Sequence, residues 1–212
     1  MRLRKVKDAK LKLMESRYFI GEPESYKGKW LSLFNNSNPI HIEIGCGKGK
    51  FISELASKNP NINYVAIEKF DSVLLRASEK LEELELNNLK ITILDAGELL
   101  NYFDDKEISK IYLNFSDPWP KKCHAKRRLT SKLFLDSYRR ILADDGVIIQ
   151  KTDNRGLFEY SLESYCANNY LIKNICLDLH ADEERFPDNI TTEFEEKWMD
   201  KGPIYYLEAY KR

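Results

Sequence analysis

Five carboxylates stand at the ends of five apolar, strand-like segments, in an arrangement that can build a binding site. They are Glu43, Glu68, Asp95, Asp117 and Asp153, in the segments HIEIG, YVAIEK, ITILDA, LNFSDP and IIQKTDN. A single acid at such a position commonly caps the next helix or shapes a turn. Five in order are harder to explain in this way, because the carboxyl ends of parallel strands meet at the edge of the sheet where ligands bind. We therefore expect a ligand that offers hydroxyl groups, amino groups or a positive charge.

A glycine loop follows the first of these strands and narrows the class of ligand. The run Gly45–Gly49 has the spacing G-x-G-x-G, whereas dinucleotide-binding proteins have G-x-G-x-x-G. This spacing disfavours a nucleotide-dependent oxidoreductase. Because glycine has no side chain, Gly45 and Gly47 let the backbone approach a bulky ligand closely, and we assign both to its binding.

The acids around this loop indicate which ligand it is. Glu43 would repel a pyrophosphate but could pair with an ammonium group. Glu68 is placed to accept hydrogen bonds from ribose hydroxyls, and Asp95 could accept one from an adenine amino group. A nucleoside that carries a positive charge and an amino acid tail meets all three requirements. The sequence therefore predicts S-adenosylmethionine as the cofactor.

The fourth acid adjoins a proline-rich turn and a block of positive charge. Proline after Asp117 restricts that residue to extended backbone, which helps to fix its carboxylate. The turn 117–120 is related in geometry to the Asp/Asn-Pro-Pro-Tyr/Phe turn that holds an amine beside the donor in amino-methyltransferases; a rigid turn around a core tryptophan is the simpler alternative. The run 121–128 holds five Lys or Arg residues and His124, a pattern typical of a phosphate-binding surface.

Strand-like and helical patterns alternate along the chain and must position these groups. Strands are expected at 39–44, 63–67, 91–94, 108–115 and 147–151, with two more near 171–178 and 204–210. Helices are expected over 50–57, over 74–84 with an end at Asn87-Asn88, from Thr130 or Ser131 through Leu142, and around 158–166 with Cys166 on its apolar side. A turn is expected at 144–146. This alternation predicts an α/β fold with a mostly parallel sheet covered by helices on both faces, as in Rossmann-like folds.

Composition and charge exclude several classes of protein. No apolar run approaches the length of a membrane span, and the start MRLRKVKDAKLK lacks the apolar core of a signal peptide. The four cysteines lack metal-ligand spacing, so we expect no metal site and free thiols in a reducing cytoplasm. The formal net charge is zero, yet a local basic patch can still bind phosphates. We expect 1–38 to be a basic lead-in segment of the same domain as 39–212.

From about Glu43 onward, the chain resembles the bacterial tRNA (guanine-N7-)-methyltransferases. The resemblance rests on EIGCGKGKF, AIEK, NFSDPWPKK with HAKRRL, KTDN, and TEFE near the C-terminus. It implies the class I S-adenosylmethionine-dependent methyltransferase fold, and transfer of a methyl group from S-adenosylmethionine to N7 of a guanine in the variable loop of tRNA. Guanine N7 has a lone pair and no proton, so a general base is not required. The work of the enzyme would be orientation and stabilisation of the positive charge that develops on the base.

The resemblance also implies roles for individual residues. Glu43, Glu68, Asp95 and Asp117 would bind the methyl donor, with Asp117 also at the catalytic centre. The substrate guanine would be lined by Lys121, Asp153, Thr192, Glu193, Phe194 and Glu195, and the RNA would be contacted by Cys123, His124, Ala125, Lys126, Arg127 and Arg128. Cys123 departs from the family, which often has arginine there. Thr192 and Glu195 also have the spacing of a capping box at a helix start, and both roles can hold at once.

Two other readings stay open at this point. An amino-methyltransferase that acts on another nucleic acid or on a small molecule would use the same donor, although the sequence lacks the Pro-Pro-Tyr turn and contains the basic run. A non-catalytic RNA-binding module would not need Glu43, Asp95 and Asp117 intact. The sequence does not decide between a monomer and a homodimer.

Overall fold

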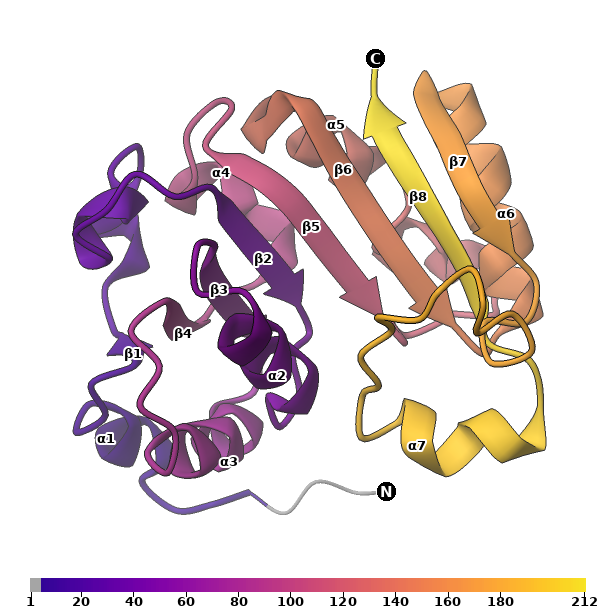
Figure 1. The fold of residues 1–212 in the computed structure, drawn as a ribbon. Coiled ribbons are helices and arrows are strands. Elements are labelled where there is room, and N and C mark those ends of the chain that lie inside the picture. Colours follow the sequence, from indigo (N-terminus) through magenta and orange to yellow (C-terminus); the bar gives the residue numbers. More distant parts are fainter. Residues whose placement is uncertain (1–4) are drawn as a thin grey trace.

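The computed structural model describes residues 5–212, within which eight strands form one sheet in the order β1-β4-β3-β2-β5-β6-β8-β7 (Figure 1). The strands are β1 (Phe19–Ile20), β2 (Ile40–Ile44), β3 (Asn63–Glu68), β4 (Leu89–Ile93), β5 (Ile108–Asn114), β6 (Leu142–Thr152), β7 (Tyr170–Cys176) and β8 (Tyr205–Lys211). The α-helices are α1 (Ala9–Leu13), α2 (Lys50–Lys58), α3 (Asp71–Leu81), α4 (Leu99–Tyr102), α5 (Lys132–Ile141), α6 (Arg155–Ala167) and α7 (Glu195–Trp198). Short 3₁₀ helices are η1 (Pro23–Tyr26), η2 (Trp30–Leu33), η3 (Ala96–Glu98), η4 (Lys122–Arg127) and η5 (Met199–Lys201).

The sheet is parallel from β1 to β6, and β8 runs antiparallel between β6 and β7. Every residue of β2 and β3 is buried, which is typical of parallel strands that are covered on both faces. The prediction of a mostly parallel sheet is confirmed. The carboxyl ends of β2, β3, β4 and β5 therefore lie along one edge, where the acids predicted to bind a ligand can meet.

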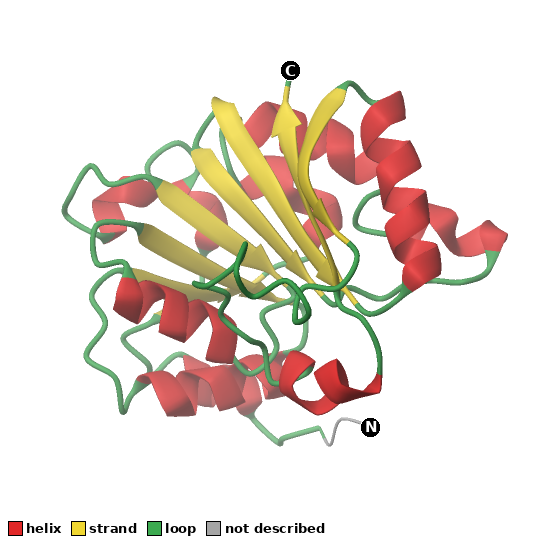
Figure 2. Ribbon diagram, turned by 45° about the vertical axis from the view of Figure 1, so that its right-hand side comes forward, coloured by secondary structure: helices red, strands yellow, loops and turns green. Residues whose placement is uncertain are grey.

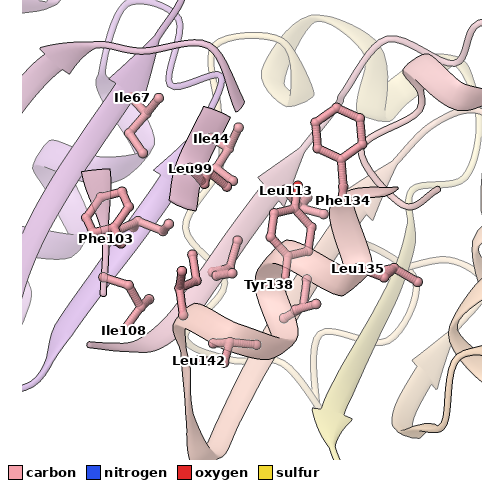
Figure 3. Packing of buried hydrophobic residues seen from close by; sticks show 14 of the residues in the cluster. Ile44, Ile67, Leu99, Phe103, Ile108, Leu113, Phe134, Leu135, Tyr138 and Leu142 are labelled. Atoms are coloured by element: carbon pink, nitrogen blue, oxygen red, sulfur yellow. The ribbon is translucent and has the colours of Figure 1, made fainter. Parts of the chain in front are cut away.

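Helices cover both faces of the sheet (Figure 2). On one face, α1, α2 and α3 bury side chains such as Leu13, Ile52 and Leu74 against β3 and β4. On the other face, α4, α5 and α6 form a second cluster, which includes Leu99, Phe134, Tyr138 and Leu135 (Figure 3). Burial of this apolar area is the main driving force for the fold.

The lead-in segment packs into this framework. Trp30 is fully buried, its ring stacks on Phe103 with centroids 5.1 Å apart, and its Nε1 donates a hydrogen bond of 2.8 Å to the carbonyl of Tyr102. Strand β1 pairs with β4 and extends the sheet by one strand. Neither α1 nor β1 has a sequence pattern long enough to predict it. Within residues 5–212, no helix has the length and hydropathy needed to cross a membrane.

The largest departures from the predicted boundaries are at the end of α3 and at the start of β6. Helix α3 ends at Leu81 rather than at Asn87-Asn88, because the carbonyl of Leu84 accepts hydrogen bonds from the side chains of Tyr18 and Arg17 instead of continuing the helix. The turn expected at 144–146 lies inside β6, which begins at Leu142, a residue predicted to belong to the helix. The pairing of β5 with β6 shifts register between Ile108 and Lys110. Strand β6 therefore contains residues 144–146 as an irregularity within the strand.

Two predicted side-chain roles near the helices also differ. Ser131 stands at the N-cap of α5, but its hydroxyl donates to the carbonyl of Lys126 and does not cap the helix. Cys166 is exposed rather than on the apolar side of α6. The Ser131 side chain bonds to the preceding loop instead of the helix. The Cys166 side chain faces solvent instead of the core.

We expect Gly49→Ala to destabilise the protein. Gly49 is the N-cap of α2 with a φ of +79°, and an added Cβ would lie 3.0 Å from the Cβ of Ala77 on α3. Left-handed backbone is unfavourable for residues with a side chain, so the free energy of unfolding should fall by about 1–3 kcal/mol in urea denaturation.

The matched control is Gly202→Ala. Gly202 has extended backbone and open space around it, so its substitution should change stability by no more than about 0.5 kcal/mol. Equal effects of the two substitutions would show that the α2–α3 approach does not require glycine.

Candidate active site

An open pocket of about 810 Å³ lies beyond the carboxyl ends of β2 to β5. Of the residues predicted to bind the donor, it is lined by Gly45, Gly47, Glu68, Asp95 and Asp117. Other lining residues include Phe70, Asn114, Ser116, Lys126 and Arg127. The fold therefore brings together predicted residues from four separate loops. In the described part of the chain, no cluster of three or more His, Cys, Asp or Glu side chains could hold a metal ion.

Glu68 fixes the glycine loop at one wall of the pocket. Its Oε2 accepts a hydrogen bond of 3.1 Å from the backbone N–H of Gly47, and its Oε1 accepts from the N–H groups of Lys69 and Phe70 at 2.8 and 3.1 Å. Gly45 and Gly47 have φ values of +83° and +59°, a conformation that favours glycine. Burial raises the pKa of Glu68, and the three N–H donors partly offset this rise.

Asp95 lies across the pocket at the end of β4. Its Oδ1 accepts a hydrogen bond of 2.9 Å from the N–H of Gly97, and its Oδ2 pairs with the Lys69 ammonium at 2.7 Å. The hydrogen bond from Lys69 is the main reason that the pKa of Asp95 is lowered. Phe70 lines the same pocket, and its side chain is 56% exposed. An exposed aromatic ring beside a hydrogen-bond acceptor suits a flat heterocycle with an amino group.

Glu43 does not itself line the pocket; it is buried in a polar cluster with Asn114, which does. Its Oε1 accepts a hydrogen bond of 2.8 Å from Asn114 on β5. Glu43 Oε2, Asn114 Oδ1 and Ser116 Oγ are all buried without a protein partner. Burial raises the pKa of Glu43 to about 8. Buried polar atoms are rarely left without partners, so this cluster is suited to a ligand with hydrogen-bond donors.

Asp117 lies in a strained turn of the backbone after β5, residues 115–119, which we call the elbow. The residues two positions away on either side, Phe115 and Trp119, have φ values of +50° and +41°, which are costly for residues with large side chains. The Asp117 side chain is exposed at the pocket. The elbow is held from outside by Arg128, which donates hydrogen bonds to the carbonyls of Pro118 at 3.1 Å and Trp119 at 3.0 Å.

The basic run divides into two groups with different surroundings. Arg128 points inward to the elbow, and its guanidinium lies 4.2 Å from the ring centroid of Tyr160. Arg127 stacks on Trp119 at 4.8 Å and, with Lys126, lines the pocket. The first three residues of the run, Lys121, Lys122 and Cys123, are exposed, and His124 and Ala125 are half-buried. Arg128 therefore supports the elbow in this structure, and any contact that it makes with RNA stays a prediction.

The segment 191–198 is anchored by a buried ion pair. Lys151, near the end of β6, lies 2.7 Å from Glu195 Oε2, and both side chains are almost fully buried. Glu195 Oε1 lies 2.9 Å from His180 Nε2 and accepts a hydrogen bond of 3.1 Å from Asn189. The backbone N–H of Glu195 donates to Thr192 Oγ1 at 2.9 Å, and the N–H of Thr192 donates back to Glu195 Oε2 at 3.3 Å. The predicted capping box is confirmed.

This anchoring sets where the other predicted substrate residues lie. Phe194 packs against Phe115 of the elbow, with ring centroids 4.9 Å apart. Glu193 pairs with Lys80 of α3 at 2.5 Å. Asp153 is exposed in the loop after β6 and does not line the pocket. Glu195 has no exposed surface, so in this conformation the carboxylate holds its own segment and does not reach a ligand.

Comparison with known proteins identifies the family. Residues 37–207 match the family described as "Putative methyltransferase". The chain is 50% identical to a tRNA (guanine-N(7)-)-methyltransferase of Streptococcus mutans over 207 residues, 97% of each chain. It is 49% identical to the enzyme of that name from Lachnoclostridium phytofermentans, which covers 100% of this chain and 99% of the relative. The chain belongs to this methyltransferase family.

Solved structures agree on the fold. The 16S rRNA methyltransferase KamB has a TM-score of 0.64 and 13% identity, covering 87% of this chain and 93% of that one. Phosphoethanolamine N-methyltransferase 2 of Haemonchus contortus, solved with S-adenosyl-L-methionine, has a TM-score of 0.54 and 12% identity, covering 87% of this chain and 53% of that one. The fold is the Rossmann-like class I S-adenosylmethionine-dependent methyltransferase fold, as predicted.

Sequence reasoning missed several residues of the pocket. Asn114 and Ser116 lie within the quoted motif NFSDP, and a polar residue inside an apolar strand is a signal that could have identified Asn114. Phe70 follows Glu68 by two positions, but an aromatic residue before a helix has no specific signal. The inward role of Arg128 depends on Tyr160 of α6, which is far away in the sequence.

We expect Glu43→Gln to change how stability depends on pH. The ordinary pKa of this carboxyl is 4.5 and burial raises it to about 8. Between these values the folded protein holds a proton that the unfolded chain releases, so the contribution of Glu43 to the free energy of unfolding falls as pH rises through this range. Urea denaturation at several pH values should show a steeper decline for the wild type than for Glu43→Gln.

Glu159→Gln serves as the control, because Glu159 is an exposed side chain on α6. Its pH profile should follow that of the wild type. Parallel profiles for all three proteins would mean that Glu43 is ionised throughout this range.

We expect Arg128→Ala to be destabilising and Lys126→Ala to be nearly neutral. Loss of Arg128 leaves the carbonyls of Pro118 and Trp119 without their donor, which should lower the free energy of unfolding by about 1–3 kcal/mol. Lys126 is exposed, so its removal should cost no more than about 0.5 kcal/mol. Denaturation curves measured side by side decide this, and equal costs would rule out a supporting role for Arg128.

Proposed function

We propose that this chain transfers the methyl group of S-adenosylmethionine to N7 of a guanine in the variable loop of tRNA. The observation that carries the proposal is the position of Asp117, which stands between the pocket that suits the donor and the basic run. Family membership supports the same reaction, because relatives that are half identical over nearly their whole length bear that name.

The residues around the pocket fit the three parts of this donor. Glu68 Oε2 accepts only one hydrogen bond from the protein and keeps a lone pair that can accept from a ribose hydroxyl. Asp95 and the exposed ring of Phe70 suit the adenine. Glu43 and Asn114 each keep a buried oxygen without a partner, to which an ammonium group could donate. The donor supplies an electrophilic methyl group on a positively charged sulfur.

The chain's own residues would then orient the acceptor. Guanine N7 carries a lone pair and no proton, so no side chain has to remove one. Asp117 at the pocket rim can accept hydrogen bonds from guanine N1–H or N2–H₂, which adenine cannot donate in the same pattern. A carboxylate near the base also stabilises the positive charge that the purine ring gains. Asp153 and Lys121 are proposed as further groups around the guanine.

The segment 192–195 would line the guanine in two ways. Thr192, Glu193 and Phe194 are proposed to face the base, since Phe194 already packs beside the elbow. Glu195 would act from behind, because its buried carboxylate holds the segment through Lys151. This assignment differs from a direct contact between Glu195 and the base.

The RNA itself would lie along the basic run. Lys126 and Arg127, which line the pocket, are proposed to contact phosphates next to the target nucleotide, with Cys123, His124 and Ala125 alongside them. Arg128 would contribute indirectly by holding the elbow. We place the reaction in the cytoplasm, where unmodified tRNA is available, and the enzyme as a monomer or a homodimer.

The experiment is incubation of the purified protein with unmodified tRNA and S-adenosylmethionine, followed by nucleoside analysis. The expected product is N7-methylguanosine, and the tRNA chain should break at that nucleotide after mild reduction and aniline treatment. Methyl incorporation that resists this cleavage would indicate a different target atom, as in an amino-methyltransferase.

Asp117→Asn tests the central residue in the same assay. The amide keeps the shape of the side chain but loses the charge, so kcat should fall by about a hundredfold or more while tRNA affinity changes little. Asp136→Asn on α5, whose exposed carboxylate pairs with Lys132, should keep full activity. An Asp117→Asn enzyme with wild-type kcat would remove Asp117 from the reaction.

A further inference from the structure

A row of aromatic rings leads away from the pocket onto α7. Phe115 of the elbow contacts Phe194, with ring centroids 4.9 Å apart. Phe194 in turn stacks on Trp198, with centroids 5.6 Å apart and an interplanar angle of 23°. Lys201 completes the row, with its Nζ 4.0 Å from the centre of the Trp198 ring. Phe115 lines the pocket, so the row connects the pocket with the outer surface.

The outer part of this row is open to solvent. The side chains of Phe194 and Trp198 are 40% and 41% exposed. Large aromatic side chains gain free energy from burial, and these two remain exposed although the segment that carries them is firmly fixed. Helix α7 lies below the carboxyl ends of β5 and β6 (Figure 1), on the side to which these strands point.

The row is rigid because of Glu195, which lies between Phe194 and Trp198 in the sequence and has a buried side chain. Its carboxylate is held by Lys151, His180 and Asn189. Neighbouring contacts on α2 add to this, since Lys50 donates to Thr191 and pairs with Glu196 at 3.0 Å. An exposed aromatic ring that is already fixed is suited to stacking with a ligand, because the ring itself does not have to be ordered on binding.

The chemistry of the proposed reaction creates a ligand of this kind. An enzyme that modifies a base within folded RNA has to take the base out of its stack, which costs free energy. The base next to the target then loses its stacking partner. An aromatic side chain can replace that partner, and such stacking tolerates any base because every base has a π-face.

We propose that Trp198, backed by Phe194, forms a stacking surface for a base of the RNA that neighbours the target guanine, on the ring face that Lys201 covers in this structure. The target base enters the pocket on the Phe115 side of the row, and Phe194 separates it from the neighbouring base on Trp198. Lys201 moves from the face of the Trp198 ring to a phosphate when the RNA binds. This inference rests on the proposed function, and it adds Trp198 and Lys201 to the RNA-binding residues.

The surroundings of the row favour a nucleotide over a second protein. The exposed apolar surface consists of two rings with Met199 beside them, which is far smaller than the area that a stable protein interface buries. Lys197 and Lys201 lie on the same short segment as three other charged side chains: Glu193 and Glu196, which pair with Lys80 and Lys50, and the exposed Asp200. Lys201 is the one that covers the ring, and cations beside aromatic rings are typical of surfaces that bind single-stranded nucleic acid.

The test measures binding of an unmodified tRNA transcript at several salt concentrations. Trp198→Leu should weaken tRNA affinity by about tenfold without changing the slope of log affinity against log salt, because stacking releases no counterions. Trp198→Tyr should retain most of the affinity. Lys126→Ala should instead reduce the salt slope by about one. Met199→Ala, an exposed neighbour outside the row, should bind as the wild type does.

The outcomes separate this inference from the proposed function. If the wild type binds and methylates tRNA while Trp198→Leu binds as tightly as Met199→Ala, the stacking surface is wrong and the function stands. If the wild type does not bind tRNA, both are wrong. Sedimentation of the same variants detects a different use of the row: a dimer that Trp198→Leu dissociates, with unchanged tRNA affinity, would assign the surface to a second copy of the chain.

Discussion

Lys151 joins the two halves of the site. Its backbone carbonyl accepts a hydrogen bond of 2.8 Å from the N–H of Phe115, where the left-handed elbow begins. Its side chain reaches the other way, to Glu195 at 2.7 Å, and also donates to the carbonyl of Ile190. One residue at the end of β6 thus fixes both the elbow that carries Asp117 and the segment that faces it. Removal of either charge would leave the other buried and unpaired, which is strongly destabilising.

A buried ion pair is a weak source of stability, because desolvation of both charges consumes most of their attraction. Burial lowers the pKa of Lys151, and the Glu195 carboxylate partly restores it. The better explanation for the pair lies in its position. An apolar contact at this place would have no preferred direction. The Glu195 carboxylate instead makes directed hydrogen bonds with Lys151, His180, Asn189 and Thr192. Such a set fixes the orientation of a loop, and a loop that faces a reaction centre needs its side chains within a fraction of an ångström of their working positions.

The sequence predicted the part of the site that follows from strand ends. Glu68, Asp95 and Asp117 meet at one pocket because parallel strands end at a common edge. This follows from the order of the strands and does not depend on how the side chains between these acids pack. Contacts that depend on packing between distant elements could not be predicted. Arg128 looked like its basic neighbours, and only its hydrogen bonds to the elbow and its position over Tyr160 separate it from them. Glu195 looked like an acid facing the ligand, and its capping-box spacing gave no sign of the Lys151 partner that buries it.

The acids of the site differ in character because their burial differs, although their residue types are nearly the same. Glu43 is fully buried with one oxygen unpartnered, and burial raises its pKa to about 8. Asp95 is half-exposed and beside Lys69, so its pKa is lowered and it stays ionised. In a ligand with an ammonium group at one end and an aromatic amine at the other, Glu43 would suit the ammonium group and Asp95 the amine. A nearby positive charge favours the ionised form of a carboxyl group, so an ammonium group beside Glu43 would lower its pKa, whereas a neutral analogue would leave its buried oxygen unpartnered.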